Sequence, residues 1–599
     1  MGKPKDPHPM PPAFSAMWRA LVRARKAEPL LLTVSFSLAL LAAVPDALLA
    51  LWLALLADGV IARRNNEVLG AAIGLALSAA ATWILRVISD RTQRHFRERL
   101  TITLEAHVAE LEASVATVEH HERQVYVDRL SMLRNQVFVL DHMYWSLFTT
   151  CGWILRLIVT LALLISIHPA LALLAVFAIP TVFTSTWRPE VERKADERGA
   201  WAQRLARHLF LLATTAPPGK EVRVTRIGQK LVEQRRTTWE RWYGPVAAAR
   251  NGSAAWQALS WTIFALAYVA GVVFVSSVLK GTPGQVLLVL AAGARLSIYI
   301  GAAVGEIGFL RGFWLDGSRR LAWLEDYAES LRHGTDAPAP ESIRKGIDFE
   351  NVSFAYPGTD RLVLEDVNLH LEPGSVVAIV GENGAGKTTL VKLLSRMYLP
   401  TSGRVLIDGV DLAHIAPDTW RAKLAGAFQD FFRFEFKALN SVGVGDLPRH
   451  EDLPAVAAAV EHAGANDVIE RLAHGLETQL GPTWPDGVEL SFGQWQKLAL
   501  ARGFMRERPL LLILDEPTAA LDAETEHALF ERFAAAAREQ TSDGRITILV
   551  SHRFSTVRMA DFIVVLDGAR VVEAGSHEEL IAREGQYAEL YGIQAAAYR

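Results

Sequence analysis

The chain has 599 residues, of which 51% are hydrophobic and 21% are charged, and its formal net charge is −3 at pH 7. This length exceeds one ordinary domain, and the nearly balanced charge argues against nucleic acid as a main partner. The single cysteine, Cys151, excludes a disulfide framework within the chain and a zinc site built from several thiolates.

A short helix lying in a membrane interface is expected over residues 12–26. Phe14, Trp18 and Val22 recur there at helical spacing, with arginines between and after them. An apolar stripe beside basic residues is typical of helices that lie in the lipid headgroup region. No short apolar segment followed by a small-residue cleavage site is found, so we expect no removable signal peptide.

Six apolar stretches follow, each of about the length that a helix needs to cross a bilayer, which is roughly 20 residues. They are Leu30–Ala57, Val68–Ile88, Met143–Ile167, Leu171–Trp187, Ala254–Leu279 and Val286–Phe309. Residues 1–332 are therefore predicted to form an α-helical membrane domain with six transmembrane helices and two long cytoplasmic loops.

Basic residues set the predicted orientation of this domain. Six of them precede the first span, namely Lys3, Lys5, Arg19, Arg23, Arg25 and Lys26. Positive charge concentrates on the cytoplasmic side of membrane proteins, and Arg63 and Arg64 in the first outward loop do not outweigh this bias. We expect a multi-pass protein of the cytoplasmic membrane, in contact with membrane lipid, with its N-terminus and soluble domain in the cytoplasm.

The two long loops, roughly residues 90–142 and 188–251, are charged and helix-rich, and we interpret them as membrane helices prolonged into the cytoplasm. Their tips are expected at Glu119–Leu130 and Pro217–Gly228. Each tip is either a solvated helical hairpin or a surface that docks on the soluble domain. We favour docking, because a soluble domain fused to this membrane unit can act on it only through contact.

Charged residues within the predicted spans each cost a few kcal/mol at the bilayer centre. Four of them are singled out as candidates, namely Asp46, Arg156, Arg295 and Glu306. Two interpretations stay open at this point. The residues form ion pairs inside the helix bundle, or they line a polar cavity for a polar or amphipathic cargo.

A polar linker is expected at residues 333–346 and a second, α/β domain at 347–599. Within it, a strand-like run leads into a glycine-rich loop, and a helix-like run follows. The loop has the pattern G-x-x-x-x-G-K-[ST] and consists of Gly381, Glu382, Asn383, Gly384, Ala385, Gly386, Lys387 and Thr388, followed by Thr389. Glycines let backbone N–H groups close around phosphate oxygens, and the helix presents its positive end to the anion. A P-loop domain that binds a nucleoside triphosphate is predicted.

Five polar side chains have expected roles at this triphosphate. Lys387 would reach the β- and γ-phosphates, and the Thr388 hydroxyl would ligate Mg²⁺. Asp515, at the end of an apolar strand-like run, would hold the same ion directly or through water. The adjacent Glu516 would polarise the attacking water as the general base. His552 follows another such run and would donate to the γ-phosphate.

In this order and spacing, these motifs and Leu490–Gln494 resemble the nucleotide-binding domain of ATP-binding cassette (ABC) transporters. The six-span half is similar to the exporter-type membrane domain of that superfamily, so the resemblance covers nearly the whole chain. It implies that Tyr356 stacks on adenine. It further implies that Gln429 takes part in catalysis as a ligand of Mg²⁺ and links the Mg²⁺ site to the membrane domain. It also implies that Asp522 lies in a loop that touches the opposite subunit.

The resemblance also implies a dimer. In this family each ATP lies between one phosphate loop and the partner's signature segment, here carrying Ser491, Gly493 and Gln494. One chain has one phosphate loop and one signature segment, so it is expected to be a half-transporter that pairs with a second copy. Intact Glu516 and His552 favour a homodimer over a heterodimer, in which one site is often degenerate.

Two details refine the resemblance. Phe492 stands where the commonest signature has glycine, and a bulky residue there could alter the approach to the partner's γ-phosphate. Three runs look like those of bacterial exporters of lantibiotic-type modified peptides, although multidrug and lipid exporters share parts of them. The runs are Lys220–Arg223, Phe428–Phe432 and Gly493–Arg502.

The sequence therefore predicts an ATP hydrolase coupled to transport, with ATP and Mg²⁺ as cofactors and an unknown substrate exported by alternating access. The alternatives are an importer of the same superfamily or one subunit of a heterodimeric multidrug or lipid transporter. An ATP-gated channel is a further alternative. A non-transporting ATPase that acts on DNA or ribosomes is opposed by the six spans.

Overall fold

The computed structural model describes residues 8–123, 125–127, 129–130, 133, 140–310, 315–331, 337–516, 544–551 and 554–597. The chain divides into two compact units. The first comprises Met1–Ala113 and Arg129–Asp326, and the second comprises Ser114–Asp128 and Tyr327–Arg599. The tip of the first long loop, within Ser114–Asp128, therefore belongs to the second unit.

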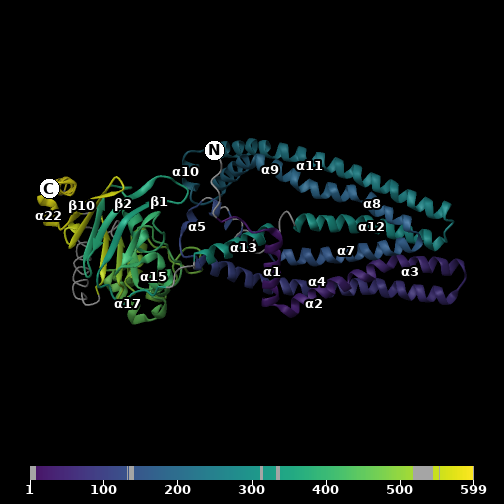
Figure 1. The fold of residues 1–599 in the computed structure, drawn as a ribbon, viewed down its shortest axis with the longest axis horizontal. Coiled ribbons are helices and arrows are strands. Elements are labelled where there is room, and N and C mark those ends of the chain that lie inside the picture. Colours follow the sequence, from purple (N-terminus) through teal and green to yellow (C-terminus); the bar gives the residue numbers. More distant parts are fainter. Residues whose placement is uncertain are drawn as a thin grey trace. The chain divides into compact units, whose positions relative to one another are not determined.

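The first unit is helical. Its helices are α1 (Ala13–Ala27), α2 (Pro29–Leu41), α3 (Ala43–Ile61), α4 (Asn65–Ser114), α7 (His142–Ile167), α8 (Leu173–Phe177), α9 (Ile179–Thr214), α10 (Gly219–Val224), α11 (Gly228–Val273), α12 (Pro283–Phe309) and α13 (Leu315–Ser330). The longest helices, among them α4, α7, α9, α11 and α12, run side by side (Figure 1). A 3₁₀ turn, Pro169–Ala172, precedes α8, and a π turn, Phe274–Val278, follows α11.

Among the described residues, five helical stretches are long and apolar enough to cross a membrane. They are Pro29–Ile61, Asn65–Ser114, His142–Ile167, Gly228–Val278 and Pro283–Phe309. The fourth predicted span, Leu171–Trp187, falls on a shorter apolar helical stretch, Pro169–Thr184. The helical membrane-type domain is confirmed, and the total of six spans stays a prediction.

Proline accounts for the interruptions in the first and fourth predicted spans. Proline lacks an N–H group, and its ring clashes with the carbonyl group four residues earlier. Pro45 is four residues beyond Leu41, where α2 ends, and Pro180 is four residues beyond Val176, in the last turn of α8. Both spans were predicted as continuous, and both consist of shorter helical pieces.

The helix predicted over residues 12–26 is α1. Its buried face carries only small side chains, Ala16, Ala20 and Ala24. Its exposed apolar side chains are Phe14, Trp18 and Val22. The last turn holds Arg25 and Lys26. This division into a packed alanine face and an exposed aromatic face agrees with the amphipathic pattern of the sequence.

The second unit contains two sheets. One has the order β2-β1-β4-β5 and is antiparallel; its strands are β1 (Ile347–Ala355), β2 (Leu362–Leu371), β4 (Ser402–Ile407) and β5 (Val410–Asp411). The other has the order β10-β9-β3-β8-β7-β6; its strands are β3 (Val376–Gly381), β6 (Leu424–Ala427), β7 (Leu511–Asp515), β8 (Ile546–Val550), β9 (Phe562–Asp567) and β10 (Arg570–Gly575). All of its pairings are parallel except that of β10 with β9. This arrangement confirms the predicted α/β domain.

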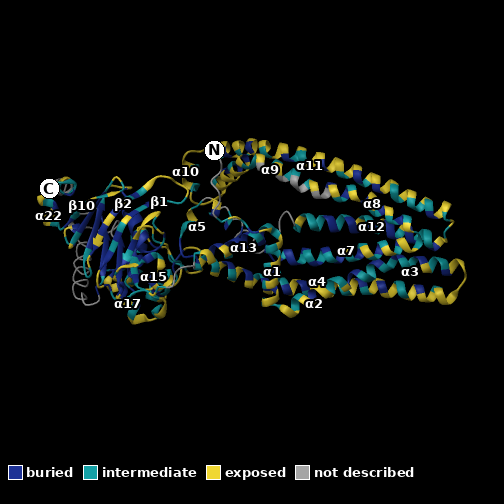
Figure 2. Ribbon diagram, in the orientation of Figure 1, coloured by how far each residue is buried: buried dark blue, intermediate teal, exposed yellow. Residues whose placement is uncertain are grey.

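Helices complete the second unit. They are α5 (Glu119–Glu122), α14 (Lys387–Leu394), α15 (Pro417–Arg421), α16 (Ala438–Gly443), α17 (Leu453–His462), α18 (Asn466–Glu470), α19 (Phe492–Gly503), α21 (Phe554–Val557), α22 (His577–Ala582) and α23 (Gln586–Ala597). The parallel strands β7 and β8 are buried along their whole length. Strands covered on both faces have continuous apolar runs, as these two do. Much of the sheet region of this unit has the colour of buried residues in Figure 2.

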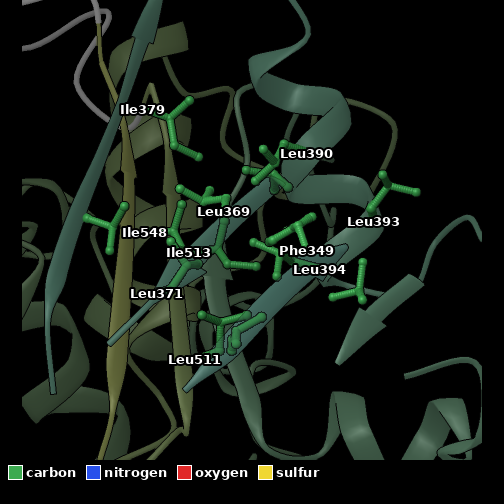
Figure 3. Close-up of a cluster of buried hydrophobic side chains, with 14 of the residues drawn as sticks. Phe349, Leu369, Leu371, Ile379, Leu390, Leu393, Leu394, Leu511, Ile513 and Ile548 are labelled. Carbon is green, nitrogen blue, oxygen red and sulfur yellow. The ribbon is translucent and has the colours of Figure 1, made fainter. Parts of the chain in front are cut away.

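The main core of this unit joins both sheets to α14 (Figure 3). Phe349 and Leu371 of the antiparallel sheet lie in the same cluster as Ile379 and Ile513 of the parallel sheet. Leu390 contributes from α14. The helix that follows the glycine-rich loop is therefore fixed to both sheets by buried apolar side chains.

Trp420 tests this core. Its side chain is completely buried, and its indole Nε1 donates to the carbonyl oxygen of Leu394, at a distance of 2.8 Å. We expect Trp420→Ala to destabilise the domain by about 3–5 kcal/mol, because it leaves a cavity and an unpaired carbonyl group. Thermal unfolding of the purified protein in detergent measures the effect. Trp484→Ala, at a 53% exposed position, is the control, and equal shifts for both variants would contradict the assignment.

Candidate nucleotide-binding site

The glycine-rich loop lies between β3 and α14, as the sequence predicts. Gly381 and Gly386 have φ angles of +150° and +104°. A Cβ atom on Gly381 would lie 2.2 Å from the carbonyl oxygen of Leu566, and one on Gly386 would lie 2.7 Å from that of Val363. Both positions therefore require glycine, because the backbone is left-handed and neighbouring carbonyl groups leave no room.

Lys387 begins α14 and is buried. Its Nζ donates to the carbonyl oxygens of Gly381 and Glu382, at distances of 2.8 and 3.0 Å. Burial lowers the pKa of the ammonium group, and the nearby Glu516 and Asp515 carboxylates oppose this shift. The lysine ammonium group is thus hydrogen-bonded to carbonyl groups of its own loop. When a phosphate binds, its oxygens would replace these carbonyl groups as partners of the lysine.

Two carboxylates lie at the carboxyl end of β7. Asp515 is fully buried, and neither of its oxygens has a hydrogen-bond partner among the described residues. Burial raises its pKa to about 6, against the opposing effect of the Thr388 hydroxyl. Glu516, with φ of +45°, accepts a hydrogen bond of 2.9 Å from Nε2 of Gln429. The structure thus brings Gln429 to the predicted general base.

The donor set at Asp515 fits a magnesium ion. Mg²⁺ prefers oxygen ligands and is held by one or two protein groups together with substrate phosphates and water. A buried carboxylate without a partner, beside a threonine hydroxyl and a phosphate loop, offers this chemistry. Thr388 and Asp515 are the residues that would hold the ion.

A cavity of about 650 Å³ lies in front of the loop. Its lining comprises Tyr356, Val363, Asn383, Gly384, Gly386, Lys387, Thr388, Thr389, Gln429 and Glu516. All but Val363 were predicted from the sequence. Val363 of β2 was missed because an apolar residue in a strand carries no signal of ligand contact.

Tyr356 forms one wall of the cavity. Its hydroxyl lies 3.0 Å from Oγ1 of Thr389, and its ring contacts those of Phe354 and Tyr398 edge to face. The ammonium group of Lys392 lies 5.4 Å from the Tyr356 ring centroid. This packing fixes an aromatic face beside the phosphate loop, which suits the predicted stacking on adenine.

The predicted signature residues lie elsewhere in the unit. Ser491 caps α19 through a hydrogen bond from the backbone N–H of Gln494 to its hydroxyl, and the Gln494 side chain accepts from the Ser491 N–H. Gly493 lies in the first turn of this helix. None of the three is among the residues that line the cavity. His552 and Asp522 lie outside the described residues.

The tip of the first long loop packs on the second unit, which confirms docking for its described part. The Val118 N–H donates to the Met397 carbonyl oxygen at 3.1 Å. Glu122 of α5 accepts a hydrogen bond from the Tyr398 hydroxyl and lies 3.6 Å from Nζ of Lys392. Tyr398 and Lys392, which contact Glu122, also contact the ring of Tyr356. The second tip, Pro217–Gly228, lies in the first unit, and its docking stays a prediction.

Three of the four charged residues singled out within the predicted spans form one network. Oδ2 of Asp46 lies 3.2 Å from Nε of Arg156, and Oδ1 lies 3.0 Å from Nη1 of Arg295. The Tyr299 hydroxyl also donates to Asp46, at 2.9 Å. Glu306 lies apart and accepts from the Ser146 hydroxyl, at 2.6 Å.

Arg156 also borders a cavity of about 260 Å³ within the first unit. Its guanidinium lies 4.5 Å from the ring centroid of Trp153, which lines the same cavity. Both interpretations that the sequence left open therefore apply in part to Arg156, which is paired with Asp46 and borders a cavity with a mixed polar and apolar lining.

Residues 364–519 match the family described as ABC transporter. The chain is 42% identical over 262 residues to an ATP-dependent lipid A-core flippase of Pseudomonas fluorescens (strain Pf0-1), covering 43% of this chain and 42% of that protein. It is 36% identical over 330 residues to the ATP-dependent lipid A-core flippase of Pseudomonas putida (strain KT2440), covering 54% and 52%. The chain thus spans about half the length of the curated relatives it matches.

Among solved structures, a bacterial Atm1-family ABC exporter with ATP bound is similar over 97% of this chain and 99% of that chain. The TM-score is 0.72 and the sequence identity 24%, so this likeness establishes the fold. The second unit thus contains an ABC transporter ATP-binding domain. The chain as a whole has the fold of that ABC exporter, which agrees with the fold expected from its motifs and apolar spans.

The buried carboxylate of Asp515 makes stability depend on pH. Its pKa in the folded state lies near 6, above the usual value, so the cost of burying the charge is greatest above pH 6 and disappears as pH falls toward 4. We expect Asp515→Asn to stabilise the nucleotide-free protein by about 2 kcal/mol at pH 7.5, less at pH 5, and to abolish ATP turnover.

Thermal unfolding at the two pH values, with nucleotide and divalent cations removed, measures this effect. Asp360→Asn, at an exposed position, is the matched control and should leave the midpoint unchanged at both pH values. A lower midpoint for Asp515→Asn than for the parent at pH 7.5 would contradict the assignment of an uncompensated charge.

Proposed function

We propose that the chain works as a homodimer that hydrolyses ATP to export a polar or amphipathic substrate across the cytoplasmic membrane by alternating access. The observation that carries the proposal is a single cavity that gathers the phosphate loop, Gln429 and Glu516. This cavity lies in an ABC-type domain on the same chain as apolar helices of membrane-spanning length. A nucleotide site alone would not require such helices.

At this site Glu516 is the proposed general base. Its carboxylate is oriented by a hydrogen bond from the side-chain amide of Gln429. Lys387 would exchange its carbonyl partners for β- and γ-phosphate oxygens. Mg²⁺, when bound by Thr388 and Asp515, would neutralise charge on the phosphates. His552 is proposed as a further γ-phosphate donor, from its position in the sequence.

The first long loop offers a route from ATP to the membrane helices. Tyr398 contacts the Tyr356 ring and also donates to Glu122 of α5. Lys392 likewise lies near both the Tyr356 ring and Glu122. A shift of Tyr356 when adenine binds would therefore move the end of α4, which leads directly to this tip. A bound ligand changes the conformation only to the extent that it favours one state.

The membrane network supports a substrate with an anionic group. Two guanidinium groups, on Arg156 and Arg295, share the single carboxylate of Asp46. An unbalanced charge is costly inside a bilayer, and an anionic group on the substrate would compensate it. The similarity to proteins called lipid A-core flippases agrees with an amphipathic substrate. A modified peptide or a drug is the alternative substrate, and an importer or a heterodimer subunit the alternative transporter.

Glu516→Gln tests the catalytic assignment. The amide keeps the shape of the side chain but removes the base, so we expect ATP turnover to fall by about 100-fold or more, while ATP binding is retained. Phosphate release by the purified protein in lipid nanodiscs measures turnover. Glu578→Gln, at an exposed position of α22, should match the parent. Turnover of the Glu516 variant at the parent rate would show that another group is the base.

Sealed proteoliposomes test the direction and class of transport. ATP added outside reaches only molecules whose ATPase domain faces outward, so an exporter will accumulate substrate inside the vesicles. We expect accumulation of fluorescent anionic amphiphiles, with ATPase stimulation that modified peptides and cationic drugs do not match. Depletion of the vesicle lumen would indicate an importer, and flux that continues without hydrolysis would indicate a channel.

A further inference from the structure

The segment that follows β6 reaches from the nucleotide cavity to the start of α19. At its first end, Gln429 lines the cavity and donates to Glu516. Two residues later, the Phe431 ring lies 5.4 Å from the ring of Phe492, measured between centroids, with an interplanar angle of 42°. This separation is within the range of favourable aromatic contacts.

Two further contacts join the same segments. The guanidinium of Arg433 lies 5.9 Å from the centroid of the Phe492 ring, within reach of a cation–π interaction. Nη1 of Arg433 also lies 3.9 Å from a carboxylate oxygen of Glu489, which is two residues before Ser491. The residues after Gln429 thus contact both flanks of the serine that caps α19.

The contact between the two rings requires an aromatic side chain at position 492. Phe492 is the first residue of α19 and is 53% exposed, whereas Phe431 is half-buried against the apolar cluster that contains Trp495 and Leu498. Glycine at position 492 would have no ring to contact. The contact with Phe431 therefore holds a half-exposed ring directly beside Ser491, at the start of α19.

We propose that the Phe431–Phe492 pair is a positioning device that couples the two ATP sites of a dimer. The inference rests on the proposed function, an ATP-hydrolysing homodimer, together with the family resemblance. The resemblance implies that Gln429 contacts the ATP bound by its own chain and that Ser491 contacts the ATP bound by the partner's phosphate loop. Movement of Gln429 on ATP binding then shifts Phe431, and through Phe492 it aligns Ser491 for the second nucleotide. Occupancy of one site thereby raises the affinity of the other.

Two variants test the pair while preserving the fold. Phe492→Gly removes the ring at an exposed position, and Phe431→Leu removes it while keeping an apolar side chain in the half-buried place. Phe492→Tyr retains the contact and should behave as the parent. Phe432→Ala is the matched control, because its ring neighbours Phe431 in sequence but contacts Phe434 instead.

The readout is ATP turnover against ATP concentration for the full-length dimer in nanodiscs. We expect a Hill coefficient near two for the parent, Phe492→Tyr and Phe432→Ala, and near one for Phe492→Gly and Phe431→Leu, with maximal rates within about threefold. The double variant, Phe431→Leu with Phe492→Gly, should match either single variant, because each substitution removes the same ring contact. A general loss of structure would instead lower the maximal rate.

Each other outcome overturns the inference. It fails if Phe492→Gly keeps the Hill coefficient of the parent, if the parent itself shows a coefficient of one, or if the double variant loses cooperativity beyond both single variants. These results leave the proposed function intact whenever the parent is a dimer whose turnover depends on Glu516. A monomeric parent, or one without ATP turnover, would instead refute the proposed function.

Discussion

A buried negative charge without a partner is the constraint on which the nucleotide site depends. Asp515 ends a strand that is covered on both faces, and within the described part of the chain its carboxylate oxygens have no hydrogen-bond partner, although the nearby Thr388 hydroxyl favours the charged form. The opposite charge of Lys387 is close enough to lower the pKa of Asp515, but its ammonium group bonds to loop carbonyls. Polar groups buried in this way lower stability until a ligand supplies their partners.

The order of the parallel strands brings distant residues to this point. Strand β8 lies between β3 and β7, and β6 follows β7 at the edge. The carboxyl ends of these strands meet at one edge of the sheet, so the loop after Gly381, the acid pair after Leu514 and Gln429 after β6 converge there. Ligands of open α/β sheets bind at this edge. The chain order β3, β6, β7, β8 gives no such arrangement by itself.

The membrane-type unit also contains partly buried charges that are only partly neutralised by opposite charges. Asp46, Arg156 and Arg295 come from three helices, α3, α7 and α12, and their charges balance only in part. The prolines that interrupt the helices free backbone groups within the bundle, as Pro45 does one residue before Asp46. Each unit thus contains charged groups that are only partly paired. In the second unit the missing partners would come with a triphosphate and its Mg²⁺, and in the first, as proposed, from an anionic group of the transported substrate.

The phosphate loop, the acid pair and the apolar spans could be predicted from the sequence alone, because each is a local pattern whose physical reason lies within a few residues. The packing of the folded chain was needed to show that Gln429 donates to Glu516, that Arg156 and Arg295 share Asp46, and that Glu122 contacts Tyr398. The structure also divides two spans that hydropathy shows as continuous, because average hydropathy does not register a missing N–H group. Contacts between residues far apart in the chain depend on strand order and helix packing, which local patterns do not specify.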